Sequence, residues 1–179
     1  MRLLYRKGRR TPEPWKGLAA GIAGGVAASW LMNRMWSVLS KAAEAVVGSE
    51  PRRQNDARGE QKEDPTVKTA DTLAEKIAGK KLSKSQKKKG GVAVHYAFGA
   101  VMGGLYGLAA EYSSVVRSAA GIPYGAALFV GADEIALPLL GLSSKPTEYP
   151  LSKHLSGFGS HVVYGTTLEL TRRLLRNQL

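Results

Sequence analysis

Four ionisable side chains fall inside apolar stretches of this sequence, where a charge is costly. Asp133 and Glu134 interrupt one apolar run, His95 lies in a second and His161 in a third. An ionised group at the centre of a bilayer costs at least about 2.5 kcal/mol, so it usually faces a partner or water inside the protein. Because histidine titrates near neutrality, an acid–histidine cluster of this kind would be able to carry protons or an ion.

Asn33 and Arg34, late in the first apolar run, are the further partners that we expect in this cluster. The alternative interpretation is structural: interhelical hydrogen bonds contributing about 0.6 kcal/mol each, with Arg34 as the counter-ion. His95, His161 and Asp133 are chemically able to bind a metal, but no two of them have the tight spacing of a specific site. We therefore expect no catalytic residue, no metal and no cofactor.

Charged and apolar residues are separated along the chain. Its 179 residues carry a net charge of +12, contain no cysteine and have a mean hydropathy of −0.18, which averages two populations. Four apolar runs approach the roughly 20 residues that a transmembrane helix needs: residues 17–39, 92–112, 121–142 and 155–170. The sequence therefore predicts an all-α integral membrane bundle of about four transmembrane helices. Its parts are a basic tail (1–16), the first helix with an extension (17–47), a basic loop (48–89) and the other three helices with a basic end (90–179).

Glycines recur at intervals of four in three of these runs. They cost a soluble helix close to 1 kcal/mol each, but in lipid they let two backbones approach closely. The pattern predicts a compact bundle, and a spare glycine face would allow a homo-oligomer. The residues concerned are Gly17, Gly21, Gly25, Gly99, Gly103, Gly107, Gly121 and Gly125, together with Gly165 on the face of His161.

The basic loop contains one predicted helix, at about residues 65–79, which we expect to lie on the membrane surface. Asp64 is suited to cap it and Pro65 to begin it. The expected contacts to anionic lipid headgroups are Lys80, Lys81, Lys84, Lys87, Lys88 and Lys89, with Arg172 and Arg173 at the other end of the chain. No aromatic residues interleave with the lysines and no nucleic-acid-binding motif is present, so we expect no nucleic-acid partner.

The sequence contains contradictory signals for the orientation of the protein in the membrane. The tail and the loop are both basic, and the positive-inside rule places both in the cytoplasm. One spanning helix between them would place them on opposite sides. Either the rule is overridden or the first run does not cross simply. The N-terminus also has a signal-peptide-like pattern, but its apolar run continues past the cleavage-like residues, which favours a retained anchor.

Two further patterns concern the later runs. HYAFGA at 95–100 and HVVYGT at 161–166 both read His-x-x-aromatic-Gly-small, which predicts a repeat of two two-helix units in parallel topology. Pro138 lacks a backbone N–H and predicts a kink close to Asp133 and Glu134.

Four stretches together resemble the YagU-like bacterial inner-membrane proteins, a family of uncharacterised molecular function. They are GLAAGIAGGVAASWLMN, HYAFGAVMGGLYGLAAE, GAALFVGADEIALPLLGL and SHVVYGTTLELTRRLLRN. The resemblance covers residues 17–35 and 95–179 and leaves out the loop at 41–89. It implies a multi-pass protein of the bacterial inner membrane and brings no established catalytic residue. The Asp133–Glu134 pair is not a feature of the family as a whole.

Three functions follow as hypotheses. The leading one is a structural or stress-related membrane protein that acts through helix–helix and lipid contacts and is not an enzyme. The second is a proton- or ion-linked conduit or transporter that uses the acid–histidine cluster. The third is a soluble, basic, helical nucleic-acid-binding protein. The sequence identifies no small-molecule substrate.

Overall fold

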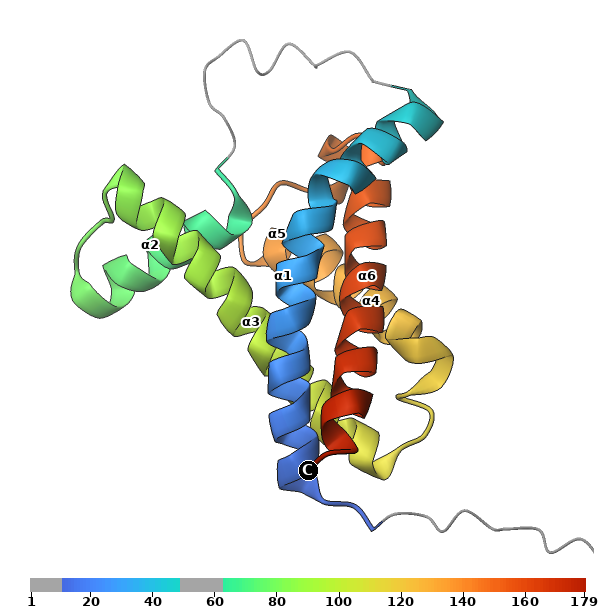
Figure 1. Cartoon of the computed structure of the whole chain (residues 1–179). Helices are drawn as coiled ribbons and strands as arrows, with labels where there is room; N and C mark the ends of the chain where they lie inside the picture. The colour runs from blue at the N-terminus through green and yellow to red at the C-terminus, as the bar shows by residue number, and fades with distance from the viewer. Residues whose placement is uncertain (1–10, 49–62) are drawn as a thin grey trace, which may run out of the picture.

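The computed structural model describes residues 11–48 and 63–179. The predictions for the tail at 1–10 and the loop at 49–62 lie outside the described residues. In the described part every regular element is helical. The long helices are α1 (Pro14–Val47), α3 (Lys84–Tyr112) and α6 (Leu151–Arg176). Helix α1 packs along both of the others (Figure 1).

The fourth part of the bundle is a composite helix. It begins with the 3-10 turn η2 (Ser118–Gly121) and α4 (Ile122–Leu128), continues as the π-helix η3 (Phe129–Ala136) and ends with α5 (Leu137–Leu139). A loop with the 3-10 turn η4 (Pro146–Glu148) then leads to α6. The π-helix contains Asp133 and Glu134 and comes directly before Pro138. The irregular backbone that Pro138 predicts near the acids is thus a π-helical stretch.

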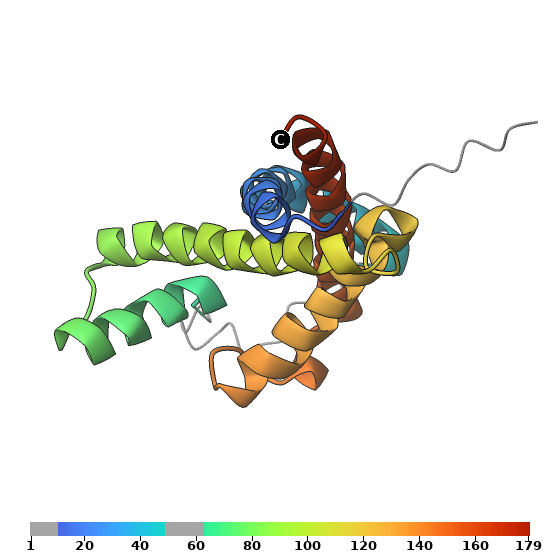
Figure 2. The same cartoon turned by 90° about the horizontal axis from the view of Figure 1, so that it is seen from below.

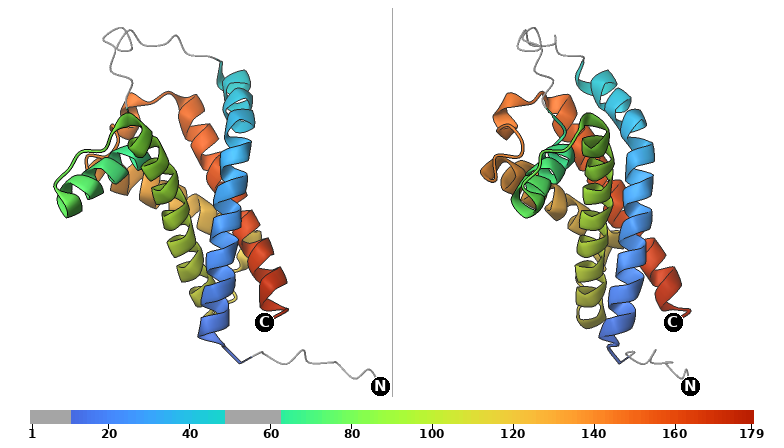
Figure 3. Two further views of the ribbon diagram at one scale, coloured as in Figure 1. Left: turned by 60° about the vertical axis from the view of Figure 1, so that its left-hand side comes forward. Right: turned by 90° about the vertical axis from the view of Figure 1, so that its left-hand side faces the viewer.

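Helices α1 and α4 run in one direction, and α3 and α6 run in the other (Figures 1 and 3). The start of α1 lies beside the end of α3, where the backbone N–H of Glu13 donates to Glu111 at 3.0 Å. Helix α1 continues without a break for 34 residues. The residues on either side of α1 therefore lie at opposite ends of the bundle. Both explanations of the contradictory orientation stay predictions, because α1 is not among the helices that are long and apolar enough to cross a membrane.

The α1–α3 contact is made by glycine faces. Gly17, Gly21 and Gly25 of α1 lie against the glycine stripe of α3 in antiparallel register. An added Cβ at Gly103 would collide with the carbonyl oxygen of Gly21, and one at Gly107 with that of Gly17. Backbone is in contact with backbone here, so no side chain can yield to make room.

A second glycine contact joins α4 to α6 and reveals the register of the internal repeat. Gly121 meets Gly165 and Glu169 of α6, just as Gly17 meets Gly107 and Glu111 of α3. The repeated unit is therefore Tyr-Gly-x-x-x-Glu, at 106–111 and 164–169. The sequence-based register, which matched His95 with His161, is wrong because the backbone contacts align the two hairpins differently: the carbonyl oxygen of His161 meets Gly125, just as that of Gly103 meets Gly21.

Both glycine stripes are thus used within the chain. No glycine face is left over for a second chain to cover, so the glycine spacing does not indicate a homo-oligomer. The homo-oligomer remains a prediction without support from the glycine pattern.

Two helical stretches of the described chain are long and apolar enough to cross a membrane: Lys84–Tyr112 and Ser118–Leu139. The prediction of four membrane-spanning helices is not supported, because glycines and polar side chains dilute α1 and α6. The apolar windows of the two candidates are only 28% and 11% buried within the protein. Large apolar side chains such as Val101, Leu105 and Val130 are exposed on the outside of the bundle. Exposed apolar side chains in such number are typical of a surface that contacts a membrane or a partner.

Helix α2 (Pro65–Ala78) packs against the first half of α3 (Figure 2). Its N-cap Asp64 accepts a hydrogen bond from the backbone N–H of Thr66 at 2.8 Å, and Gly79 ends it in the left-handed conformation. Val67 and Ala70 lie where a Cβ on Gly91 or Gly90 of α3 would be. The far end of α2 is less covered.

An ion pair fastens α2 to α3: Lys87 Nζ lies 2.7 Å from Asp71. The hydrogen bond from Lys87, with a second from the backbone N–H of Leu82, holds the pKa of Asp71 below its ordinary value.

We expect this pair to make the docking of α2 sensitive to acid. The folded pKa of Asp71 is below the unfolded one, so the pair stabilises the docked helix above the ordinary Asp pKa of about 4. That stabilisation is lost as the pH falls through the lower, folded pKa. Amide hydrogen exchange of α2, corrected for the intrinsic pH dependence, should accelerate in acid. Asp71→Asn should show the faster exchange already at neutral pH, and equal exchange in both proteins would contradict the prediction.

Candidate functional site

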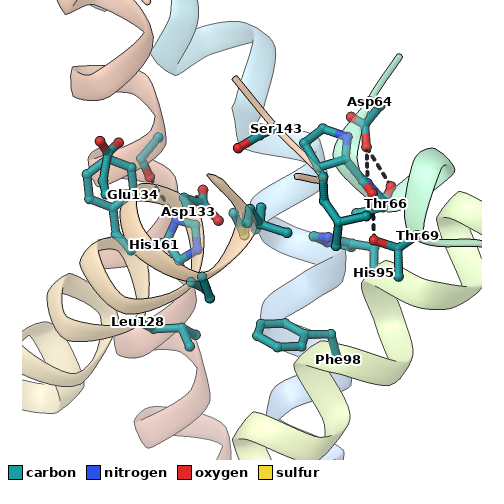
Figure 4. A pocket seen from close by; sticks show the side chains of 18 of the residues that line it. Asp64, Thr66, Thr69, His95, Phe98, Leu128, Asp133, Glu134, Ser143 and His161 are labelled. Atoms are coloured by element: carbon teal, nitrogen blue, oxygen red, sulfur yellow. Dashed lines mark hydrogen bonds and ion pairs between the residues drawn. The ribbon is translucent and has the colours of Figure 1, made fainter. Parts of the chain in front are cut away.

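A cavity of about 700 Å³ lies between α1, α2, α3, η3 and α6. It contains most of the polar cluster that the sequence predicts. Figure 4 shows Asp133, Glu134 and His161 on one wall, with His95 and Phe98 on the opposite wall. The size is within the range of about 300–1,000 Å³ that is usual for small-molecule sites.

Glu134 forms an ion pair with His154 across this wall. The Nδ1 atom of His154 lies 2.8 Å from a carboxylate oxygen of Glu134, and its Nε2 atom lies 3.1 Å from the carbonyl oxygen of Pro146. Both ring nitrogens therefore face acceptors. A neutral imidazole has only one N–H, so in that form His154 cannot donate to both acceptors at once.

Asp133, the neighbouring acid, has a different environment. Its carboxylate lies 3.9 Å from the Nδ1 atom of His161, but that nitrogen is 3.0 Å from the carbonyl oxygen of Gly157, to which it donates. No residue of the described chain donates a hydrogen bond to the Asp133 carboxylate. Its side chain is 39% exposed, and it lines the cavity.

The opposite wall is built by α1 and α3. His95 Nε2 lies 3.5 Å from the carbonyl oxygen of Ser29. The hydroxyl of Ser29 is buried at the edge of the cavity and has no hydrogen-bond partner among the described residues. The histidine that the sequence places in the second apolar run thus contacts α1 and reaches no acid directly.

Asn33 also lines the cavity, but Arg34 does not. Arg34 is exposed and its guanidinium lies over the ring of Trp30, 5.6 Å from the centroid. The prediction that Arg34 is the counter-ion of the cluster is therefore wrong, because one residue further along the helix turns its side chain away. Among the lysines and arginines of the described residues, Lys153 of α6 lines the cavity.

Sequence reasoning left three of these residues out of the cluster: His154, Lys153 and Ser29. His154 had a signal, because it precedes His161 by seven residues and so shares a helix face with it. Lys153 and Ser29 have no such pattern in the sequence.

Another set of charges lies at the far end of the bundle. Glu169 is fully buried and accepts hydrogen bonds from Arg172 at 2.7 and 3.1 Å and from Arg173. Arg176 binds Glu111 at 2.8 Å. Arg172 is itself buried, so its predicted contact with lipid headgroups is wrong: it neutralises a buried carboxylate. Arg173 is half-exposed but is paired with the same acid.

The lysines of the loop divide into two groups. Lys87 is engaged by Asp71 and by Glu63. The other five are exposed, and their contact with headgroups stays a prediction: Lys80, Lys81, Lys84, Lys88 and Lys89.

Comparison with known proteins gives a family but no activity. Residues 40–170 match the model of a family described as "Protein of unknown function (DUF1440)". No curated protein and no solved structure matches the chain significantly.

Proposed function

The chain belongs to the DUF1440 family, and from this premise we propose that it is a membrane protein acting as a proton-linked conduit or transporter through its acid–histidine cavity. The observation that carries the proposal is the Glu134–His154 pair in the cavity wall, where both ring nitrogens of the histidine face oxygen acceptors. Carboxylate–histidine groups within a membrane are typical of proton relays.

Several features support placement in a membrane. Two helices meet the length and composition of a span, and their apolar surfaces are mostly uncovered. Helices α1 and α6 contact them backbone to backbone through glycines, so they lie at the same depth. The resemblance to the YagU-like proteins favours the bacterial inner membrane. The exposed lysines at the start of α3 favour contact with anionic headgroups there.

The π-helix η3 determines where the side chains of Asp133 and Glu134 point. A π-helical segment is rare and often occurs at a functional site, because it widens the helix and redirects its side chains. Here it turns the consecutive residues Asp133 and Glu134 toward the same cavity, where each meets a different histidine of α6.

We expect Glu134→Gln to abolish proton flux. The amide cannot exchange a proton with His154, so the relay loses its donor–acceptor pair. Proteoliposomes containing a pH-sensitive dye, with an imposed pH gradient and voltage, measure the flux. It should fall to the level of empty liposomes. The control Glu75→Gln makes the same chemical change on the exposed surface of α2 and should leave the flux intact. Wild-type flux no greater than that of empty liposomes would reject the proton-linked function.

A structural role through helix and lipid contacts is the second candidate, and the glycine-packed backbones and the internal Glu–Arg pairs favour it. The same variants separate the two. A structural role predicts that Glu134→Gln lowers stability without any measurable wild-type flux. A conduit predicts loss of flux in a protein whose unfolding is unchanged.

A further inference from the structure

We propose that the cavity binds an amphipathic organic cation, with its ammonium group held by Asp133 and its apolar body against the aromatic and aliphatic walls. This inference rests on the cavity being the working site of the proposed function. Its test needs binding alone, so it can fail or succeed independently of transport.

The charges that line the cavity favour a cation. Four carboxylates contribute to its lining, and three of them already have partners in the protein. Glu134 is paired with His154, Asp64 caps α2 and Glu63 lies 3.1 Å from Lys87. Asp133 is the fourth, and no described residue donates a hydrogen bond to it.

Three basic groups lie near Asp133, and each makes another contact. The Nε2 atom of His95 lies 3.5 Å from the carbonyl oxygen of Ser29. The Nδ1 atom of His161 donates to the Gly157 carbonyl. The ammonium of Lys153 lies over the ring of Tyr149, 3.5 Å from its centroid, in a cation–π contact. A carboxylate in an apolar wall without a donor is costly. An ammonium ligand with three N–H donors would satisfy it.

The remaining lining fits the rest of such a molecule. Phe98, Leu128, Phe129 and Leu137 supply aromatic and aliphatic surface, and aromatic faces also attract cations. The hydroxyl of Ser29, a residue of the same lining, is buried and has no hydrogen-bond partner in the described protein, so its hydrogen-bonding capacity is unused. This hydroxyl is a second feature, independent of the acids, that calls for a bound molecule.

The test uses three probes that share one apolar body: 4-phenylbutylamine, 4-phenylbutanol and 4-phenylbutanoate. Isothermal titration into the full chain in lipid nanodiscs measures binding, and empty nanodiscs correct for partitioning into lipid. We expect saturable binding of the amine, at least about tenfold tighter than that of the alcohol, which is about 1.4 kcal/mol. The carboxylate should not bind.

The variant Asp133→Asn should remove the preference for the amine, and Asp133→Glu should restore part of it. Glu75→Gln is the control, since it also replaces a carboxylate by its amide, on the exposed surface of α2 and outside the cavity lining. Far-UV circular dichroism and size-exclusion chromatography establish that each variant is folded. If Asp133→Asn fails to fold, the comparison of the three probes on the wild type still tests whether the cavity prefers a cation. Equal binding of amine and alcohol, no saturable binding, or an unchanged preference in folded Asp133→Asn would each overturn the inference.

Discussion

Alanine at Gly103 should separate α1 from α3 and destabilise the protein by about 3 kcal/mol or more. Its Cβ would collide with the carbonyl oxygen of Gly21 and would lie 2.7 Å from the Cα of Gly25. Overpacking commonly costs about 1–3 kcal/mol where side chains can move. Backbone atoms of a long helix cannot move independently, so the whole contact must open.

The free energy of unfolding by sodium dodecyl sulfate in mixed micelles, followed by far-UV circular dichroism, measures this effect. The control is Gly131→Ala, where an added Cβ meets no atom within 4 Å. It should be neutral or slightly stabilising, because alanine costs less backbone entropy in a helix than glycine. Equal stability of Gly103→Ala and the control would contradict close packing of α1 on α3.

Leucine at Glu169 should destabilise the protein by about 3–5 kcal/mol, the usual cost of leaving a buried charge without its partner. The carboxylate is fully buried and neutralises Arg172, whose side chain is only 4% exposed. Leucine is close in size, so loss of the ion pair, and not a large cavity, causes most of the effect.

The double variant Glu169→Leu/Arg172→Leu should recover much of this loss, because it removes both charges together. Arg173→Leu is the comparison at the same carboxylate. The Arg173 side chain is 48% exposed, so its removal should cost no more than about 1 kcal/mol. The same unfolding titration measures all three variants. A single Glu169→Leu variant as stable as wild type would show that Glu169 carries no essential charge.

The two expected effects lie in the half of the bundle away from the cavity. There the helices touch through glycines, and the buried Tyr106 packs with Leu168. Tyr164 belongs to the same cluster and also reaches the cavity wall. The half that contains the cavity is built differently. Helix α2 packs there, and the composite helix that carries Asp133 and Glu134 is widened by the π-helix η3. Substitutions in one half can therefore change stability without changing ligand binding, and the reverse. Variants of the cavity are thus expected to stay folded.

Local features of the fold follow from the sequence because they depend on neighbouring residues. The start and end of α2 depend on a cap, a proline and a glycine within a few residues of the helix. The apolar runs of α3 and of the composite helix depend on composition alone, and length and composition are what make them candidate spans. The glycine spacing likewise identifies the contact face of each helix, since residues four apart lie on one face.

Which residues meet across helices was decided by the tertiary structure. Glu134 meets His154 only because α6 folds back on the π-helix. Arg34 leaves the cluster because one residue of helical rotation turns it by about 100°. Arg172, which reads as a headgroup contact, is buried because Glu169 lies one turn before it on the same face.

By itself the sequence determined that this protein is helical, where its apolar helices run, which faces of them are small enough for close contact, and that its acids and histidines must be sheltered. These properties are set by composition and by periods of a few residues. The tertiary structure alone decided the register of the two hairpins, the partners of the buried acids, and which carboxylate of the cavity receives no hydrogen bond from a described residue. Those depend on contacts between residues far apart in the chain, which helix packing fixes and no local pattern encodes.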